Sequence, residues 1–336
     1  MKVTKIFVFT LVLVLLSASM TEAGQLRKPG INGASFLKIG VGSRMVALGS
    51  AVTTLYGDPN MVFWNPAGIQ TEDGVTQVAL NHNNWLINLN HDAGAISHSF
   101  GNIGTIGIGV VYMGLSGLTA DRDIAPPGYE GAQVEAPGTG RYDTYDYSDV
   151  AVTLAYSKQF TDRFRMGASA KYIRESIDTE SASSVAFDFG AIYETGFRDL
   201  TIGARINNVG ADLKFYAIGA PLPLSFSIGS SFSIAKEENT QLRAYFDLTK
   251  PQDTPQLYFV GGEWTLYKKL ALRGGYKFNY SGAYDEVTRL SQTDEGFSFG
   301  GGLELPISDF KVWVDYAFTN FNVFENTHRF SLMFSF

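Results

Sequence analysis

Long runs of alternating polarity are the feature of this sequence that most constrains its fold. In VAVTLAY, Val150, Val152, Leu154 and Tyr156 alternate with Ala and Thr, and the same period of two recurs along the chain after residue 74. This period indicates β-strands that have one apolar face. The runs extend over about 9 to 13 residues, which is longer than the strands of most soluble sheets and long enough for a tilted strand to cross a bilayer.

Fourteen such runs are present, and each predicts a strand. Their ranges are 75–83, 92–101, 103–114, 147–160, 163–177, 182–195, 198–208, 222–236, 239–250, 256–267, 269–282, 294–306, 309–320 and 326–336.

The connections between these runs alternate between short and long. Short ones include GN and FTDRF, whereas long ones include 114–146, 210–221 and 281–294. Outer-membrane barrels show this alternation, with tight periplasmic turns and longer outer loops, and closure of an even number of strands leaves no free edge. We therefore predict an all-β fold: a 14-stranded antiparallel transmembrane β-barrel over 75–336, in the bacterial outer membrane. The longest connection, 115–146, is either a solvated loop or a lid that binds a partner.

The first 23 residues are predicted to be a signal peptide. Lys2 and Lys5 precede an apolar run at 6–16, and Thr-Glu-Ala at 21–23 is a tolerable cleavage site before Gly24. The apolar run is too short for a membrane-spanning helix. Because no cysteine follows it, lipoprotein anchoring is excluded.

Composition narrows the class of protein further. There is no cysteine, so disulfides cannot stabilise this exported chain. The net charge of −7 argues against a nucleic-acid partner. High counts of Gly (36), Phe (25) and Tyr (17) suit many strands in a lipid-facing wall.

Residues 24–74 lack the strand pattern and predict short helices. Ser43 could cap a first helix and Gly57 could end it. Its apolar face would consist of Met45, Leu48, Val52, Leu55 and Tyr56.

A second, shorter helix is predicted by Asp58 followed by Pro59, a cap and a proline at the first helical position. It must end near Trp64, because the next residue precedes Pro66 and is driven out of the helical region. Gly68 would supply a free backbone position. A polar-lined barrel of fourteen strands is wide enough to need filling, so we predict that residues 24–74 form a plug and that VFWNPAGIQ, at 62–70, is the hinge to the wall.

The stretch 33–69, GASFLKIGVGSRMVALGSA…LYGDPNMVFWNPAGI, resembles the N-terminal signature of the PorV/PorQ family and, more distantly, the hatch of FadL-type fatty-acid transporters. The resemblance implies a FadL-like barrel and a role in type IX protein secretion and cell-surface attachment. The chain departs from the family at Pro59 and Asn60, where a small or acidic residue is common. The resemblance marks these positions as plug or hinge: Asp58, Trp64, Asn65, Pro66, Ala67 and Gly68.

The predicted inward faces carry charges of both signs. These side chains either pair with one another and with the plug, or they line a polar channel, and their mixed sign argues against strong ion selectivity. The predicted lumen network consists of Arg165, Lys171, Asp188, Arg205, Arg243, Asp247, Glu263, Arg273, Lys277, Glu304, Lys311 and Asp315.

Signals for catalysis are weak, and we expect neither an enzyme nor a cofactor. Residues 35–38 match an SxxK motif, but its partner motifs are missing. The four histidines, His82, His91, His98 and His328, have no neighbouring spacing typical of a metal site.

Three functions remain open. A PorV/PorQ-like secretion accessory would bind a translocon or the C-terminal sorting domain of a cargo. A FadL-like transporter would bind hydrophobic small molecules such as long-chain fatty acids in an apolar pocket, with a lateral gap where 300–302, a glycine run, kinks a strand or else makes room for the plug. A soluble exported β-sandwich is the third. The first two are surrounded by outer-membrane lipid, and the terminal Phe336 resembles the signal read by the barrel assembly machinery.

We predict that Asn65→Ala or Pro66→Ala impairs plug seating or assembly, because both residues lie in the predicted hinge. Heat-modifiable gel migration and detergent stability measure this effect. Wild-type behaviour of both variants in these two assays would contradict the prediction.

Overall fold

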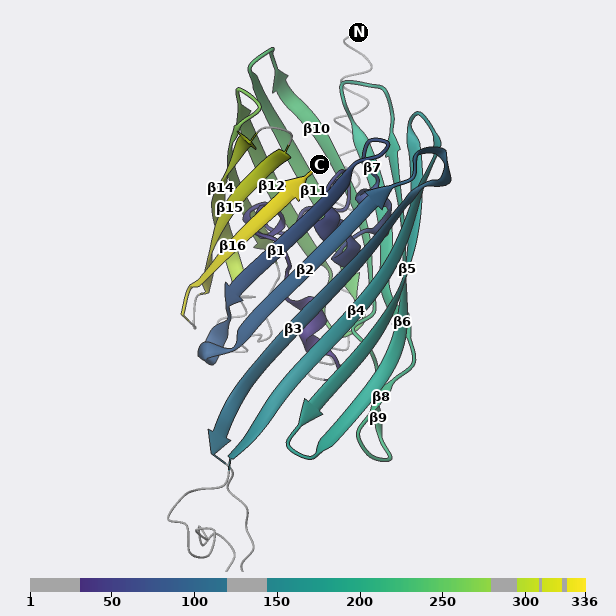
Figure 1. Cartoon of the computed structure of the whole chain (residues 1–336), viewed down its shortest axis with the longest axis vertical. Helices are drawn as coiled ribbons and strands as arrows, with labels where there is room; N and C mark the ends of the chain where they lie inside the picture. Colours follow the sequence, from purple (N-terminus) through teal and green to yellow (C-terminus); the bar gives the residue numbers. More distant parts are fainter. Residues whose placement is uncertain (1–30, 120–143, 279–294, 308–309, 322–324) are drawn as a thin grey trace, which may run out of the picture.

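A closed barrel of fourteen antiparallel strands forms the wall of the protein (Figure 1). The computed structural model describes residues 31–119, 144–278, 295–307, 310–321 and 325–336. The strands of the barrel are β1 (Thr76–Asn84), β2 (Asn90–Ser99), β3 (Thr105–Thr119), β4 (Thr144–Thr161), β5 (Phe164–Ile177), β6 (Glu180–Glu194), β7 (Thr201–Gly210), β10 (Ser225–Lys236), β11 (Thr240–Pro251), β12 (Leu257–Leu266), β13 (Leu270–Phe278), β14 (Glu295–Ile307), β15 (Phe310–Phe321) and β16 (Thr327–Ser335).

The first and last strands close the barrel. β1 pairs antiparallel with β16 from Gln77 opposite Ser335 onward. At the end of this seam, the backbones of Thr76 and Phe336 exchange two hydrogen bonds of 2.8 and 3.0 Å. The ring of Phe336 meets Phe310 edge to face, with 6.0 Å between centroids. Every strand of the barrel therefore has two neighbours, which confirms the predicted fold class.

The outer surface of the wall is apolar. Outward side chains such as Leu154, Phe189, Ile228 and Phe330 are about half exposed, whereas their sequence neighbours on the inward face are buried. A closed antiparallel wall with an apolar exterior is the architecture of an outer-membrane barrel. The soluble sandwich is therefore excluded. No helix among the described residues has the length and apolarity that crossing a membrane requires.

Several connections differ from the prediction. The long outer loop is shorter than 115–146, because β3 continues to Thr119 and β4 begins at Thr144. β5 and β6 are joined by only two residues, so the alternation of short and long connections is not strict. A small hairpin, β8 (Leu213–Lys214) and β9 (Gly219–Ala220), was not predicted.

Some predictions fall outside the described residues. These are the signal peptide at 1–23, residues 24–30 of the predicted plug, and most of the two longest connections, at 120–143 and 279–294.

Residues 31–74 lie inside the barrel as a chain of short helical turns, drawn in purple and dark blue in Figure 1. They are η1 (Ser35–Lys38), α2 (Ser43–Ala47), η2 (Pro59–Phe63) and η3 (Pro66–Ile69). Two further turns, η4 (Leu86–Asn88) and η5 (Gly101–Ile103), belong to connections of the wall.

The first predicted plug helix is wrong in length and in its cap. α2 has five residues, and Gly42 rather than Ser43 stands at its N-cap. It ends because Gly49 and Ser50 both have left-handed backbones, with φ of 62° and 65°. Beyond this point Val52 and Leu55 are still buried, but they reach the core from irregular backbone, and Tyr56 is exposed.

The second predicted helix is present as η2, a 3-10 helix. The Asp58 carboxylate accepts a hydrogen bond from the Asn60 backbone at 2.9 Å, Pro59 follows the cap, and the helix ends at Trp64. The Asn-Pro pair does more than stop η2, because Asn65 caps a further helix, η3. Proline at the first position of η3 suits a helix start, which explains the difference from the predicted turn.

Inward-facing glycines of the wall allow the plug backbone to approach it closely. A Cβ on Gly275 would lie 2.2 Å from the Gly49 nitrogen, and one on Gly261 would lie 2.5 Å from the Leu48 oxygen. On the opposite wall, a Cβ on Gly167 would lie 2.4 Å from the Pro66 carbonyl carbon. Real Cβ atoms do not come so close to backbone, so these positions exclude any side chain.

The glycine run at 300–302 follows the same logic. Gly300 faces Ala47 of the plug, and a Cβ there would lie 2.8 Å from the Ala47 Cβ. The register of β14 with β13 and β15 is continuous through these residues. Gly300 therefore makes room for the plug, Gly302 makes room for the side chains of Asp315 and Arg273, and the pairing of the strand is not interrupted.

We predict that Gly275→Ala displaces the plug, whereas Gly274→Ala does not. A methyl group at Gly275 would overlap the backbone at Gly49, while one at Gly274 meets nothing within 4 Å. Overpacking of this kind costs about 1–3 kcal/mol. The heat-modifiable transition in detergent should fall for Gly275→Ala and stay at the wild-type temperature for Gly274→Ala. Equal transitions would contradict the backbone contact.

Candidate functional site

A buried carboxylate on β11 holds the middle of the plug. Asp247 Oδ2 accepts hydrogen bonds from the backbone nitrogens of Val52 and Thr53, both at 2.9 Å, and from Thr53 Oγ1 at 2.6 Å. Arg205 Nη2 lies 4.0 Å from the same oxygen. This carboxylate thus satisfies plug backbone groups that have no helical partner.

A chain of charged groups clamps α2 to the wall. Arg44 of the plug forms a bidentate pair with Glu263, with both N–O distances at 3.0 Å. Arg273 Nε donates to the same carboxylate at 2.7 Å, and its Nη1 pairs with Asp315. Every charge in this chain has an opposite partner, as buried ions require.

The predicted hinge residues are packed against β3 to β6, and side chains of β7 bind the Trp64 carbonyl. Asn65 is fully buried, and its side chain donates to the Thr53 carbonyl at 2.7 Å and accepts from the Ala67 backbone at 3.1 Å. The Trp64 carbonyl accepts from Asn207 at 2.8 Å and from Arg205 at 3.3 Å. The hinge is thus fixed both to the plug and to the wall.

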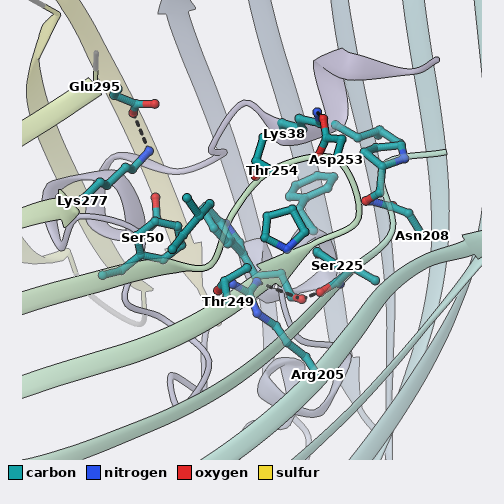
Figure 2. Close-up of a pocket in the computed structure, with 18 of the residues that line it drawn as sticks. Lys38, Ser50, Arg205, Asn208, Ser225, Thr249, Asp253, Thr254, Lys277 and Glu295 are labelled. Atoms are coloured by element: carbon teal, nitrogen blue, oxygen red, sulfur yellow. Dashed lines mark hydrogen bonds and ion pairs between the residues drawn. The ribbon is translucent and has the colours of Figure 1, made fainter. Parts of the chain in front are cut away.

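A cavity of about 330 Å³ lies between this plug and the outer half of the wall (Figure 2). Most of its surface is apolar, and its polar side chains come from the plug, from β5, β7, β10, β11, β13 and β14, and from the connection after β11. The main apolar contributors are Phe63, Trp64, Leu86, Leu257, Phe259 and Phe321.

The lysines and carboxylates that line the cavity are paired, whereas Arg205 lies 4.0 Å from Asp247 and its Nε has no hydrogen-bond partner. Lys277 binds Glu295 at 2.5 Å, and Figure 2 shows this pair beside the cavity. Lys38 of the plug pairs with Asp253. Lys171 lies 3.1 Å from Asp188 and donates to Asn208 at 2.8 Å. The surface of the cavity is therefore mostly apolar, and its lysines and carboxylates are neutralised in pairs.

The lumen residues predicted from the sequence are mostly buried and brought together in these pairs. Arg165 binds Glu194 at 2.8 Å and lies over the Tyr56 ring at 3.9 Å. Arg243 is half-buried and donates to Ser231 and Thr201, and Glu304 is also half-buried. Lys311 is exposed. The two predicted alternatives were mutual pairing of these charges and a polar channel, and the distances support mutual pairing.

The histidines are not brought together. His82 pairs with Asp92 at 2.6 Å and His328 with Tyr316 at 2.8 Å, in each case on the outward face. His98 contacts Thr76 at 2.8 Å, and His91 is buried on the inward face. Among the described residues, no group of three acidic or histidine side chains could hold a metal ion.

The SxxK motif has no catalytic geometry in η1. Ser35 is exposed and its hydroxyl donates to the Asn32 carbonyl at 3.3 Å, while Lys38 is engaged by Asp253.

Several residues of the site were not predicted. Asp253, Asn207 and Glu295 line the cavity, and Arg44 carries the plug side of the clamp. Arg44 lies in a segment with no strand period, and Asp253 lies in a connection, so alternation could not assign either a direction. Asn207 follows Arg205 on the inward face by one step of two, whereas Glu295 precedes a shift of register in β14 and could not be found by such an extension.

No family model and no curated protein matches this sequence. Solved structures do match the fold. The Ralstonia pickettii toluene transporter TbuX is 13% identical, with 88% of this chain and 97% of that chain covered and a TM-score of 0.54. The Pseudomonas putida toluene transporter TodX is also 13% identical, with 87% and 96% covered and a TM-score of 0.53. The CymD monoaromatic hydrocarbon channel is 10% identical, with 88% and 96% covered and a TM-score of 0.55.

These likenesses show a FadL-like fold. Together with the closed wall and its apolar exterior, they identify an outer-membrane barrel, as predicted from the sequence. Membership of the PorV/PorQ family is not confirmed.

We predict that Asp247→Asn loosens the centre of the plug. The amide replaces charge-assisted hydrogen bonds to Val52 and Thr53 with weaker neutral ones and leaves Arg205 with less compensation. Hydrogen–deuterium exchange should show protection at Val52 and Thr53 falling at least tenfold, which corresponds to about 1.4 kcal/mol. Asp162→Asn, in an exposed turn, is the matched control. Unchanged protection in Asp247→Asn would refute this role.

Proposed function

We propose that this protein is an outer-membrane transporter of hydrophobic small molecules. The observation that carries the proposal is the apolar cavity between the plug and the outer half of the wall. Its volume of about 330 Å³ lies at the lower end of the range of small-molecule sites, about 300–1,000 Å³.

The chemistry of the lining favours a ligand without a strong charge. Aromatic and aliphatic side chains make most of the wall, and Lys38, Lys277 and Lys171 are already paired with carboxylates. An uncharged ligand would gain from burial without breaking these pairs. Structures of the same fold include transporters of toluene and a channel for monoaromatic hydrocarbons, which supports the proposal by analogy of fold. None of these is named as an enzyme.

Long-chain fatty acids form the other class of ligand that the sequence suggests. Their acyl chain suits the same walls, but their carboxylate would need either a lysine released from its pair or Arg205, which lies 4.0 Å from Asp247. Uptake of labelled toluene and of a labelled long-chain fatty acid therefore separates the two classes.

The role in type IX secretion stays a prediction from the resemblance at 33–69. It requires a protein partner on the outer loops, and the longest of these, 120–143, lies outside the described residues. Nothing in the described geometry favours it over transport.

We predict that Ser225→Trp reduces uptake at least tenfold in cells of a Gram-negative host that lacks its own hydrophobic-compound channel. Ser225 lines the cavity from the inward face of β10, and an indole there would fill it. Ser230→Trp, on the outward face of the same strand, is the matched control and should transport normally. Equal uptake by both variants and the wild type, at equal surface expression, would refute transport through this cavity.

A further inference from the structure

A second cavity, of about 390 Å³, lies at the outer end of the barrel beside η1. It is bounded by the plug segment 32–39 and by inward side chains of β3, β4 and β5. It shares Lys38 and Glu295 with the cavity described above, so the plug segment stands between the two. The function proposed above makes no use of this second cavity.

Two carboxylates face each other across its wall. Asp149 on β4 is the direct ladder partner of Glu175 on β5, and both lie on the inward face. Like charges that are directly opposite in a sheet destabilise it unless a cation lies between them. This pair therefore needs a counterion or a shared proton.

No cation of the chain pairs with either carboxylate among the described residues. Asp149 is 1% exposed; its Oδ2 accepts from the Tyr147 hydroxyl, and its Oδ1 has no partner. Glu175 accepts from the backbone N–H of Ala34. Both other charges on this cavity are neutralised elsewhere, Lys38 by Asp253 and Glu295 by Lys277.

A further polar group of the cavity is also unsatisfied. The side-chain amide of Asn32 lines the same space, and neither its nitrogen nor its oxygen has a hydrogen-bond partner. Buried polar groups are nearly always paired, so an unpaired amide and an unpaired carboxylate oxygen in the lining of one cavity suggest that the cavity binds a polar ligand.

The rest of the lining is apolar and rich in aromatic residues. Phe36, Trp85, Met113 and Tyr147 contribute to it. Aromatic faces attract cations, and organic cations gain further from burial of their apolar parts. The cavity suits a divalent metal ion less well, because no three acidic or histidine side chains among the described residues are placed to bind one.

We propose that this second cavity binds an organic ammonium ion, whose N–H groups donate to Asp149 and Glu175 while its apolar part contacts the aromatic wall. The site is distinct from the charge-balanced cavity, and its ligand is of the opposite kind, a cation in place of a neutral molecule. The proposed binding of an ammonium ion does not depend on whether the first cavity transports hydrocarbons.

Calorimetric titration of the full chain in detergent, with empty micelles as blank, tests this site. The probe is 2-phenylethylammonium at neutral pH, compared with 2-phenylethanol, which has the same ring and no charge, and with calcium chloride. The variants are Asp149→Asn and Glu175→Gln, with Glu180→Gln as the control because Glu180 is exposed at the outer end of β6. Heat-modifiable migration reports the folding of each variant.

We expect the ammonium probe to bind the wild type and the control, and to lose at least tenfold in affinity in each of the other two variants. We expect 2-phenylethanol to bind at least tenfold more weakly. Equal binding of the two probes, tighter binding of calcium, no binding of the ammonium probe, or full affinity in folded Asp149→Asn and Glu175→Gln would each overturn the proposal. Toluene uptake by these variants should stay at the wild-type level, which separates this test from that of the transport function.

Discussion

Direct contact between the backbone of the plug and the backbone of the wall is the constraint on which the rest of the structure depends. Where the plug backbone at Gly49 or Pro66 touches a strand, the wall residue must be glycine, because a Cβ would overlap it. Irregular backbone so close to the wall has unpaired N–H groups, and these must be satisfied by wall side chains. Asp247 therefore lies where the plug backbone is irregular, at Val52 and Thr53.

This constraint also explains where the cavities lie. The plug fills the barrel across its middle, with a core of buried apolar side chains that includes Met45, Leu48 and Met61. The space that remains is on the outer side of the plug, and the segment 32–39 divides it into two parts of different charge. The first part is apolar with paired charges, and the second carries the uncompensated carboxylates of Asp149 and Glu175.

The wall could be predicted from the sequence because the alternation of residues within each strand shows which side chains face inward. Alternation depends only on neighbours along the chain, so the inward position of Arg165, Asp188 and Asp247 follows from the period of two. The plug segment has no such alternation. α2 ends at Ala47, and Gly49 with its left-handed backbone is a local signal for this end, but the course of the plug beyond Gly49 depends on packing against β12 and β13, far away in the sequence. The hydrogen bonds of Asn65 likewise depend on where Thr53 is placed.

Under the proposed function, part of the plug must move for a ligand to pass, and the clamp of Arg44 and Glu263 limits which part can move. A ligand shifts an equilibrium only by its differential affinity for the two states. The clamp at Arg44 lies outside the cavity lining, so a ligand in the cavity does not compete with it directly. Trp64 and Arg205, by contrast, line the cavity and are linked through the Trp64 carbonyl. A ligand against Trp64 would act on this link and on the hinge that follows it, while the bidentate pair at Arg44 holds the first part of the plug in place. Rearrangement of residues 64–69 therefore costs less than removal of the whole plug, and the hinge is where ligand binding and plug movement are physically coupled.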